Sequence, residues 1–329
     1  RSAAAITSRL DEYWMSIRIA EMKIPKLVAK DAGMIKQHSI KLLYALASYH
    51  ALKGIGKDVL FFTTSDRFCK YLIDALGDRN VADYSSSDAS AFRDHFFERE
   101  LSSSSVRRAF SSNRAIINLA IKEHGLNCVN GFTSKFIPEK ESPKRRMPAP
   151  TDNLRKIQAK CVSIDDDMRW LIALISDSGM RLAEAAGLLK TDINLETDIP
   201  FIELKPHEWR HLKTANSTRL IPLVGHSLWA CDRILNNGDS VFAFPRYMNG
   251  SRCNSNSASA TLNKWLRPML PENCVIHSFR HSFRDWLRDV EAPTEINDTL
   301  GGWANKSVGQ KYGAGFQLNV LAKWMQKIA

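Results

Sequence analysis

Several residues of this 329-residue chain have side chains that could act on a phosphate ester. The segment His277-Ser278-Phe279-Arg280-His281 is followed by Gly301-Gly302-Trp303 and then by Tyr312, and Arg181 stands far upstream. A phosphodiester gains charge on its equatorial oxygens during nucleophilic attack, and the forked N–H donors of arginine match those oxygens. We therefore predict that Arg181 and Arg280 stabilise the transition state of phosphoryl transfer to the phenol of Tyr312.

Proton transfer requires further groups. His277 precedes Arg280 by three residues on one helical face, and an imidazole with an ordinary pKa of about 6.5 could accept or return the phenol proton. Lys213 stands at a predicted turn, where its ammonium could protonate the departing oxygen, and Lys205 is a neighbouring alternative. Trp303 could donate its indole N–H to a phosphate oxygen or could only pack.

Two further residues are predicted to support this set. Glu184 lies one helical turn after Arg181 and could orient its guanidinium, or could be a solvated helix charge. His281 is interpreted as a supporting residue rather than a proton carrier. Tyr247 is the rival of Tyr312 as nucleophile, but it precedes the histidine–arginine segment.

In this order, the residues resemble the boxes of the tyrosine recombinases of the phage integrase family, from about Asp152 to the end of the chain. The resemblance assigns catalysis to Arg181, Lys213, His277, Arg280, Trp303 and Tyr312, with Trp303 in a place that often holds histidine. It implies a site-specific DNA recombinase of integrase or excisionase type that serves a phage or another mobile element. It also implies a 3′-phosphotyrosyl intermediate, formed without a metal or another cofactor.

Other functions remain open at this stage. A type IB topoisomerase would use similar residues to relax supercoils as a monomer, and a non-cleaving DNA-binding protein would have no need of Tyr312. The acidic run Asp165-Asp166-Asp167 could indicate a metal-dependent transposase. Three successive side chains at a helix start point in different directions, however, and acidic residues there complement the helix dipole.

The composition indicates a polyanionic partner. The formal net charge is +11, which favours double-stranded DNA. The six cysteines show neither zinc-ligand spacing nor a disulfide framework, and no apolar run is long enough to span a membrane. We expect a cytoplasmic protein that is bacterial or phage-encoded and associated with the nucleoid. The start at Arg1 suggests a trimmed chain, which a further DNA-binding module could precede.

Apolar periodicity predicts a mostly α-helical chain with a small antiparallel β-sheet. Residues 1–137 are predicted to form a helical, core-type DNA-binding domain, which the resemblance makes SAM-like. Residues 138–152 form a basic, proline-rich linker, and residues 153–329 form the catalytic domain. The linker cations Lys144, Arg145 and Arg146 could lie along the DNA backbone, or could belong to an ordinary linker.

One helix of the first domain is predicted in detail. It begins with the serines at 102–105 and ends near Gly125, and other helix breaks are expected at Gly54 and Gly77. Its buried stripe is expected to contain Val106, Phe110, Ile117, Ala120 and Ile121. Off this stripe lie Arg107, Arg114 and Lys122, which could contact DNA phosphates or form a solvated basic face.

The catalytic domain contains two further predicted elements. Residues 199–224 alternate apolar and polar side chains on either side of a short turn at 214–217, which predicts an antiparallel hairpin. Residues 317–329 form an amphipathic helix with Leu318, Leu321, Met325 and Ile328 on one stripe. The resemblance favours exchange of this helix within a homo-tetramer on two DNA sites, with packing on its own domain nearly equal. Accessory DNA-bending or directionality proteins are further expected partners.

Overall fold

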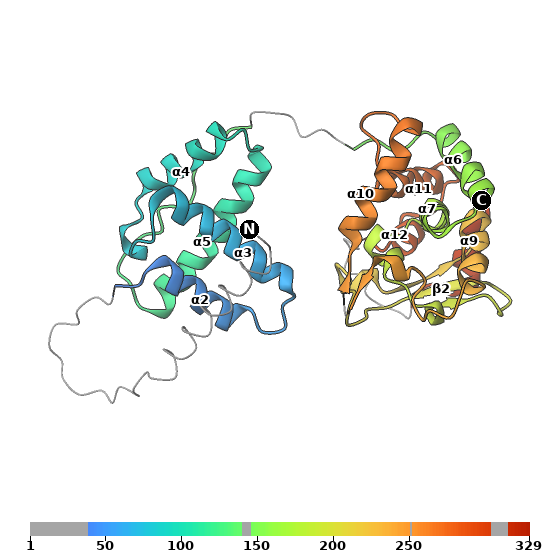
Figure 1. The fold of residues 1–329 in the computed structure, drawn as a ribbon, viewed down its shortest axis with the longest axis horizontal. Helices are drawn as coiled ribbons and strands as arrows, with labels where there is room; N and C mark the ends of the chain where they lie inside the picture. The colour runs from blue at the N-terminus through green and yellow to red at the C-terminus, as the bar shows by residue number, and fades with distance from the viewer. Residues whose placement is uncertain (1–38, 140–145, 251, 304–314) are drawn as a thin grey trace. The chain divides into compact units, whose positions relative to one another are not determined.

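The computed structural model describes residues 39–139, 146–250, 252–303 and 315–329, so that Tyr312, Lys144 and Arg145 lie outside the described residues. The chain divides into two compact units, Arg1–Ser142 and Pro143–Ala329, and the division falls within the predicted linker (Figure 1). Helices dominate both units, and the second unit also contains small antiparallel sheets. The predicted fold class is confirmed. Within the described ranges, no helix combines the length and apolar character needed to cross a membrane.

The first unit is a helical bundle around an aromatic core. Its described elements are α2 (Leu42–Lys53), α3 (Val59–Leu76), a 3₁₀ turn (Val81–Asp83), α4 (Ser86–Glu98) and α5 (Ser103–Glu123). Its buried aromatic residues include Phe92, Phe96, Phe110 and Phe132. The ring centroids of the other three lie within 6.0 Å of the ring centroid of Phe92. These large rings give a small unit enough apolar burial to hold its helices together.

The helix predicted from residue 102 onward is α5. Ser102 caps it by accepting a hydrogen bond from the backbone N–H of Ser105. Its buried stripe contains Val106, Phe110, Ile117 and Ala120, as predicted, whereas Ile121 is only partly buried. Gly54 and Gly77 are the C-cap residues of α2 and α3, and Gly125 follows α5 with a φ of 57°. The glycine breaks are therefore confirmed.

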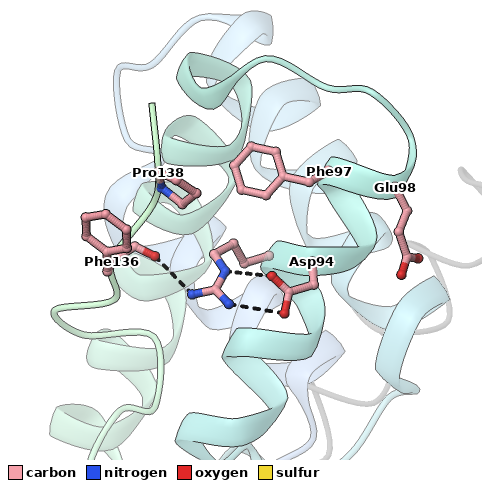
Figure 2. Close-up of a pocket in the computed structure, with 6 residues that line it drawn as sticks. Asp94, Phe97, Glu98, Phe136 and Pro138 are labelled. Carbon is pink, nitrogen blue, oxygen red and sulfur yellow. Dashed lines mark hydrogen bonds and ion pairs between the residues drawn. The ribbon is translucent and has the colours of Figure 1, made fainter. Parts of the chain in front are cut away.

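The segment after α5 returns to α4. Arg93 on α4 donates to both carboxylate oxygens of Asp94 and, at 3.1 Å, to the carbonyl of Phe136. Figure 2 shows this bridge beside a pocket of about 470 Å³, whose lining includes Phe97 and Pro138. The bridge fastens the end of the first unit to α4.

In the second unit, the other elements pack around a central helix, α7. Its helices are α6 (Thr151–Ile164), α7 (Asp167–Ser178), α8 (Leu182–Ala186), α9 (Gly225–Leu235), α10 (Ser255–Leu266), α11 (Ser278–Asp289), α12 (Thr294–Gly301) and α13 (Leu318–Gln326). Every residue of α7 from Trp170 to Ser178 is buried, because α6, α9 and α11 pack around it. One sheet has the order β1 (Ile193–Asn194), β2 (Phe201–Leu204), β3 (Arg219–Pro222), and the other pairs β4 (Met248–Asn249) with β5 (Arg252–Cys253).

The end of the predicted linker belongs to the second unit. The Ser282 hydroxyl donates to the carbonyl of Ala149 at 2.8 Å, and the Trp286 indole N–H donates to Thr151 Oγ1 at 3.0 Å. Cys274 Sγ lies 3.5 Å from the carbonyl oxygen of Pro148. These contacts come from α11 and the segment before it, so residues 148–152 are part of the folded unit.

The predicted hairpin is partly wrong. Its strands pair antiparallel in the register Ile202 with Ile221, but β2 ends at Leu204, well before the expected turn. Residues 205–218 instead form a long connection with an internal turn, in which the backbone N–H groups of His207 and Arg210 each donate to the carbonyl of the other. The alternation of apolar and polar residues did not show which side chains of this connection face the core, since Arg210 is buried although it is charged.

The predicted amphipathic helix at the C-terminus is present as α13. Helix α13 packs on its own unit, where Leu321, Met325 and Ile328 join the core, and its neighbours are β3 and α12. Leu318 is only partly buried. The apolar stripe is therefore covered within the same chain.

Candidate active site

Arg181 is placed by the junction between α7 and α8. Helix α7 ends at Gly179 in the left-handed region, and Arg181 is the N-cap of α8, with its backbone N–H donating to Glu184 Oε2 at 2.9 Å. Its guanidinium donates to Glu184 Oε1, to Ser217 Oγ at 3.0 Å and to the carbonyl of Gly302 at 3.3 Å. The side chain is 21% exposed, so an anion from solvent can reach a guanidinium that the protein already orients.

The pair predicted between Arg181 and Glu184 is present, and it involves a second arginine. Glu184 is buried, and Arg219 Nη2 lies 3.2 Å from its Oε2. Burial alone would raise the pKa of Glu184, but the two guanidinium groups and the backbone N–H outweigh it, and the pKa is lowered. The carboxylate therefore stays ionised between two cations.

Arg219 is a site residue that the sequence analysis missed. It opens β3, where it was interpreted as a strand residue, and its side chain is 3% exposed. It donates to the carbonyls of Leu300 at 2.9 Å and Ser217 at 2.8 Å. Gly302 has a φ of 59°, and a Cβ there would lie 2.7 Å from Arg219 Nη1, so only glycine fits this close approach. A buried arginine two residues after a turn gives no distinctive sequence signal.

Arg280 lies on α11, and its side chain reaches the ends of α7 and α12, the same two places that hold Arg181. Its two η nitrogens donate to the carbonyls of Gly179 and Gly301, and the residue is buried. Burial lowers the pKa of Arg280 to about 9, and the nearby Arg181 and Arg219 add to the shift. The group is still protonated at neutral pH, and an anion placed beside Arg181 would relieve this repulsion.

Trp303 packs against cations. The guanidinium carbons of Arg280 and Arg284 lie 4.5 and 4.6 Å from the centroid of its indole ring. Its backbone N–H donates to the carbonyl of Asp298 at 2.9 Å, and Arg284 Nη2 lies 3.3 Å from the carboxylate of the same residue. This arrangement supports a packing role in which the ring holds Arg280 in place, and it adds Arg284 to the residues that the sequence analysis missed.

His277 lies at the start of α11, half-buried. Burial lowers its pKa to about 4, with further contributions from His281, Arg280, Arg146 and Arg181. The ring of His281, which is exposed, lies 5.4 Å from that of His277 in an edge-on arrangement. His277 is thus neutral at physiological pH, which suits the acceptance of a proton. Arg146 is the one predicted linker cation among the described residues, and it lies near enough to influence this histidine.

This environment predicts an unusual titration. In the free protein, the ring protons of His277 should keep constant NMR shifts from pH 8 to pH 5.5, because protonation of a group with a pKa of about 4 begins only below that range. The spectrum of His277→Gln identifies its signals, and His226→Gln provides a matched control for a histidine outside the site. A midpoint near pH 6.5 for His277 would contradict the buried, cationic surroundings described here.

The two candidate lysines lie in different surroundings. Lys205 Nζ lies 2.7 Å from Glu203 and 4.0 Å from the buried Asp192, so carboxylates engage it. Lys213 is exposed, just before the 3₁₀ turn Ala215–Ser217 whose last residue contacts Arg181. Lys213 therefore stands four residues before Ser217, which contacts Arg181. Arg181, Arg219 and Arg280 are together called the arginine cluster.

Of the candidate nucleophiles, Tyr247 belongs to the core. It is 3% exposed, and burial raises the pKa of its phenol. Its hydroxyl oxygen has no hydrogen-bond partner among the described residues. Residues 143–329 contain one other tyrosine, Tyr312, so a phenolic nucleophile supplied by the second unit would have to be this residue.

The three carboxylates of the acidic run have separate partners. Asp165 accepts from the Trp170 indole N–H, Asp166 caps α7 through Arg169, and Asp167 pairs with Arg246 at 2.7 Å. Among the described residues, no three histidine, cysteine or acidic side chains are grouped to hold a metal ion.

The predicted DNA-binding cations of the first unit lie on α5 and are exposed. Arg107 pairs with Glu139 at 2.9 Å in a solvated ion pair, which an anion can displace at small cost. Lys122 lines a groove of about 620 Å³ together with Lys53 and Lys57, which the sequence analysis missed. Arg114 is also exposed, but it does not line this groove.

Glu184→Gln should destabilise the second unit strongly. The substitution leaves Arg219 and Arg181 without their shared carboxylate, and loss of one partner of a buried ion pair typically costs roughly 3–5 kcal/mol. Tryptophan fluorescence during urea unfolding measures this, since only Trp14 lies outside the unit. Glu203→Gln removes a half-exposed carboxylate from the same unit and should cost less than about 1 kcal/mol. Equal changes in the free energy of unfolding for the two substitutions would show that the buried ion pairs do not contribute to stability.

Solved structures resemble most of this chain. The Tn1549 transposon integrase in complex with transposon right-end DNA has a TM-score of 0.63 and 16% identity, with coverage of 87% of this chain and 99% of that one. A lambda integrase tetramer bound to a Holliday junction has a TM-score of 0.62 and 15% identity, with coverage of 83% and 77%. At these identities the likeness shows the fold.

Sequence comparison identifies the family. Curated protein sequences give no match. The sequence profile described as the phage integrase family matches residues 150–317, which is more than half of the chain. The matched range contains the arginine cluster, Trp303 and Tyr312. The chain therefore belongs to the phage integrase family of tyrosine-type site-specific recombinases.

Proposed function

We propose that this protein exchanges DNA strands at specific sites through a covalent bond between Tyr312 and a 3′ phosphate. The observation that carries the proposal is the convergence of Arg181, Arg219 and Arg280 on one corner, between the ends of α7 and α12, with Glu184 as the carboxylate that Arg181 and Arg219 share. Buried guanidinium groups that repel one another are a prepared site for an anion such as a phosphodiester. Arg181, which is partly exposed, and the remaining donors of Arg280 would contact it.

The reaction balances without a cofactor. The Tyr312 oxygen forms a bond to phosphorus, the bond from phosphorus to the 5′ oxygen breaks, and a 5′ hydroxyl leaves. His277, which is neutral, accepts the phenol proton, and Lys213 supplies a proton to the leaving oxygen. The phosphotyrosyl bond retains the energy of the phosphodiester, so a 5′ hydroxyl from a second duplex can reverse the step without ATP.

The partner in this proposal is double-stranded DNA. The groove containing Lys53, Lys57 and Lys122, together with Arg107 and Arg114, supplies the first unit with cations for phosphates. The linker cations Lys144, Arg145 and Arg146 would lie along the backbone of the same duplex. In support, the Tn1549 and lambda integrases with the same fold were solved with DNA.

Strand exchange between two duplexes needs several active sites. We extend the proposal to a homo-tetramer on two sites, for which the lambda integrase tetramer on a Holliday junction is the precedent. The strands exchanged would belong to a phage or another mobile element, and DNA-bending or directionality proteins would select integration or excision.

The proposal is tested by trapping the covalent intermediate. Nicked duplexes tiled across the DNA that flanks the gene are incubated with the protein and resolved on a denaturing gel. A nick near the scissile phosphate releases a short fragment on cleavage, so the adduct accumulates on the duplex that contains the site. Binding without any adduct would favour the non-cleaving alternative, and relaxation of supercoiled DNA by a monomer without site preference would favour the topoisomerase.

A further inference from the structure

The connection that carries Lys213 is fastened to the arginine cluster at one end. At this end, Ser217 accepts from Arg181 at 3.0 Å, and its carbonyl accepts from Arg219 at 2.8 Å. Thr214 Oγ1 lies 3.1 Å from Ser217 Oγ, so the turn immediately after Lys213 is also tied to these contacts. Whether Lys213 can move away from Arg181 therefore depends on how the first part of the connection is held.

Arg210 fastens that start, three residues before Lys213. Its guanidinium is 2% exposed and donates to the carbonyl of Glu184 at 2.6 Å and to the carbonyl of Lys205. Glu184 lies on α8, and Arg181 is the N-cap residue of this helix. One buried side chain thus joins the lysine connection to the helix that orients an active-site arginine.

A second layer holds Arg210 and its turn. Asp192 is fully buried, with Arg210 Nη2 at 3.9 Å and His207 Nε2 at 2.8 Å. The ring of His207 stacks on Trp209 with centroids 4.7 Å apart. Trp209 in turn donates its indole N–H to the carbonyl of Gly187 at 3.0 Å. The internal turn 207–210 is therefore built onto the segment that follows α8.

We propose that Arg210 is a positioning residue for Lys213: by joining Glu184 and Lys205 through their carbonyls, it restricts the lysine to the few residues between two fixed points. The proposal rests on the role of Lys213 as the acid in the proposed function. Three residues span at most about 10 Å when extended, so fixed ends limit how far the backbone of Lys213 can move from the turn that contacts Arg181. Arg210 itself touches no reacting atom.

The chemistry of the leaving group separates positioning of an acid from a general structural role. A 5′ oxygen needs a proton as it departs, whereas a 5′ sulfur leaves as a thiolate, because thiols have a pKa near 8.5. With sulfur, the tyrosine oxygen bonds to phosphorus, the phosphorus–sulfur bond breaks, and no proton is consumed. The experiment measures single-turnover adduct formation on the trapped duplex with either oxygen or sulfur at the scissile 5′ position.

On the oxygen duplex, we expect Arg210→Met to slow adduct formation by about 10- to 100-fold and Lys213→Ala by about 10²- to 10³-fold. On the sulfur duplex, both variants should come within about threefold of the unchanged protein, since the acid is no longer needed. Arg210→Lys, which keeps one donor, should lose less on oxygen than Arg210→Met.

Arg280→Lys is the matched contrast, because it alters another buried arginine of the site, which donates to the carbonyls of Gly179 and Gly301 rather than to the connection that carries Lys213. It should lose activity equally on both duplexes. Trp209→Phe removes the bond to Gly187 and keeps an aromatic ring beside His207. It provides a milder variant in case Arg210→Met does not fold, and should show the same recovery on sulfur.

The positioning role would be overturned if Arg210→Met lost the same fraction of its rate on oxygen and on sulfur while the rate of Lys213→Ala recovered on sulfur. If Arg210→Met does not fold, the same comparison applies to Trp209→Phe. Failure of Lys213→Ala to recover would remove Lys213 as the acid, and with it the role of Arg210. An absence of adduct from the unchanged protein on both duplexes would reject the proposed function itself.

Discussion

We expect Tyr312→Phe to bind the cleavable duplex with unchanged affinity and to form no covalent adduct. The substitution removes one oxygen, the proposed nucleophile, and keeps the aromatic ring. Loss of a nucleophile lowers the rate by about 10⁴-fold or more, which takes the adduct below detection on a denaturing gel. A filter-binding titration on the same DNA shows that affinity is retained.

Tyr247→Phe is the control for this result. Tyr247 is the other tyrosine of the second unit, and its buried hydroxyl has no partner among the described residues, so its removal should change cleavage by less than about twofold. If Tyr312→Phe still formed an adduct, the nucleophile would have to come from elsewhere. Loss of the adduct only in Tyr247→Phe would reverse the assignment.

Arg280→Lys should lower the cleavage rate by about 10³-fold, which corresponds to roughly 4 kcal/mol of transition-state stabilisation. Arg280 contacts the carbonyls of Gly179 and Gly301 at the same time, and a planar fork is needed to do so while it offers further donors to a phosphate. Lysine keeps the charge but has no fork. DNA affinity, measured by the same titration, should change by less than about threefold, because most phosphate contacts lie elsewhere.

Arg288→Lys is the matched control on the same helix. Arg288 is exposed, and its partner Asp285 lies one turn away at the surface, so the exchange should leave cleavage unchanged. Comparable activity of Arg280→Lys and the unchanged protein would show that positive charge alone suffices at this corner. The fork of Arg280 would then have no catalytic importance.

Local sequence patterns predicted much of this molecule. The stripe of α5, its serine cap and the glycine breaks depend on residues within a few positions of one another. The pair between Arg181 and Glu184 is equally local, since Arg181 caps α8 and Glu184 lies three residues later in the first turn of this helix. The order of Arg181, Arg280, Trp303 and Tyr312 indicated the family without any knowledge of their contacts.

Residues that act through long-range contacts escaped prediction. Arg219 and Arg210 looked like polar members of a strand, yet both are buried and bind carbonyls or carboxylates of α8 and α12. Lys53 and Lys57 joined Lys122 only when α2, α3 and α5 came together. The cover of α13 was likewise undecided, because an apolar stripe shows that a partner exists but does not identify it.

The order of residues along the chain sets which chemical groups are available and near which helices they lie. It does so because side-chain chemistry and helical periodicity are properties of short stretches of chain. Folding in three dimensions sets which arginines are buried and which carbonyls they bind, keeps His277 neutral, and encloses Tyr247 in the core. Burial and pKa depend on groups brought together from distant positions, and a reading of neighbouring residues does not contain that information.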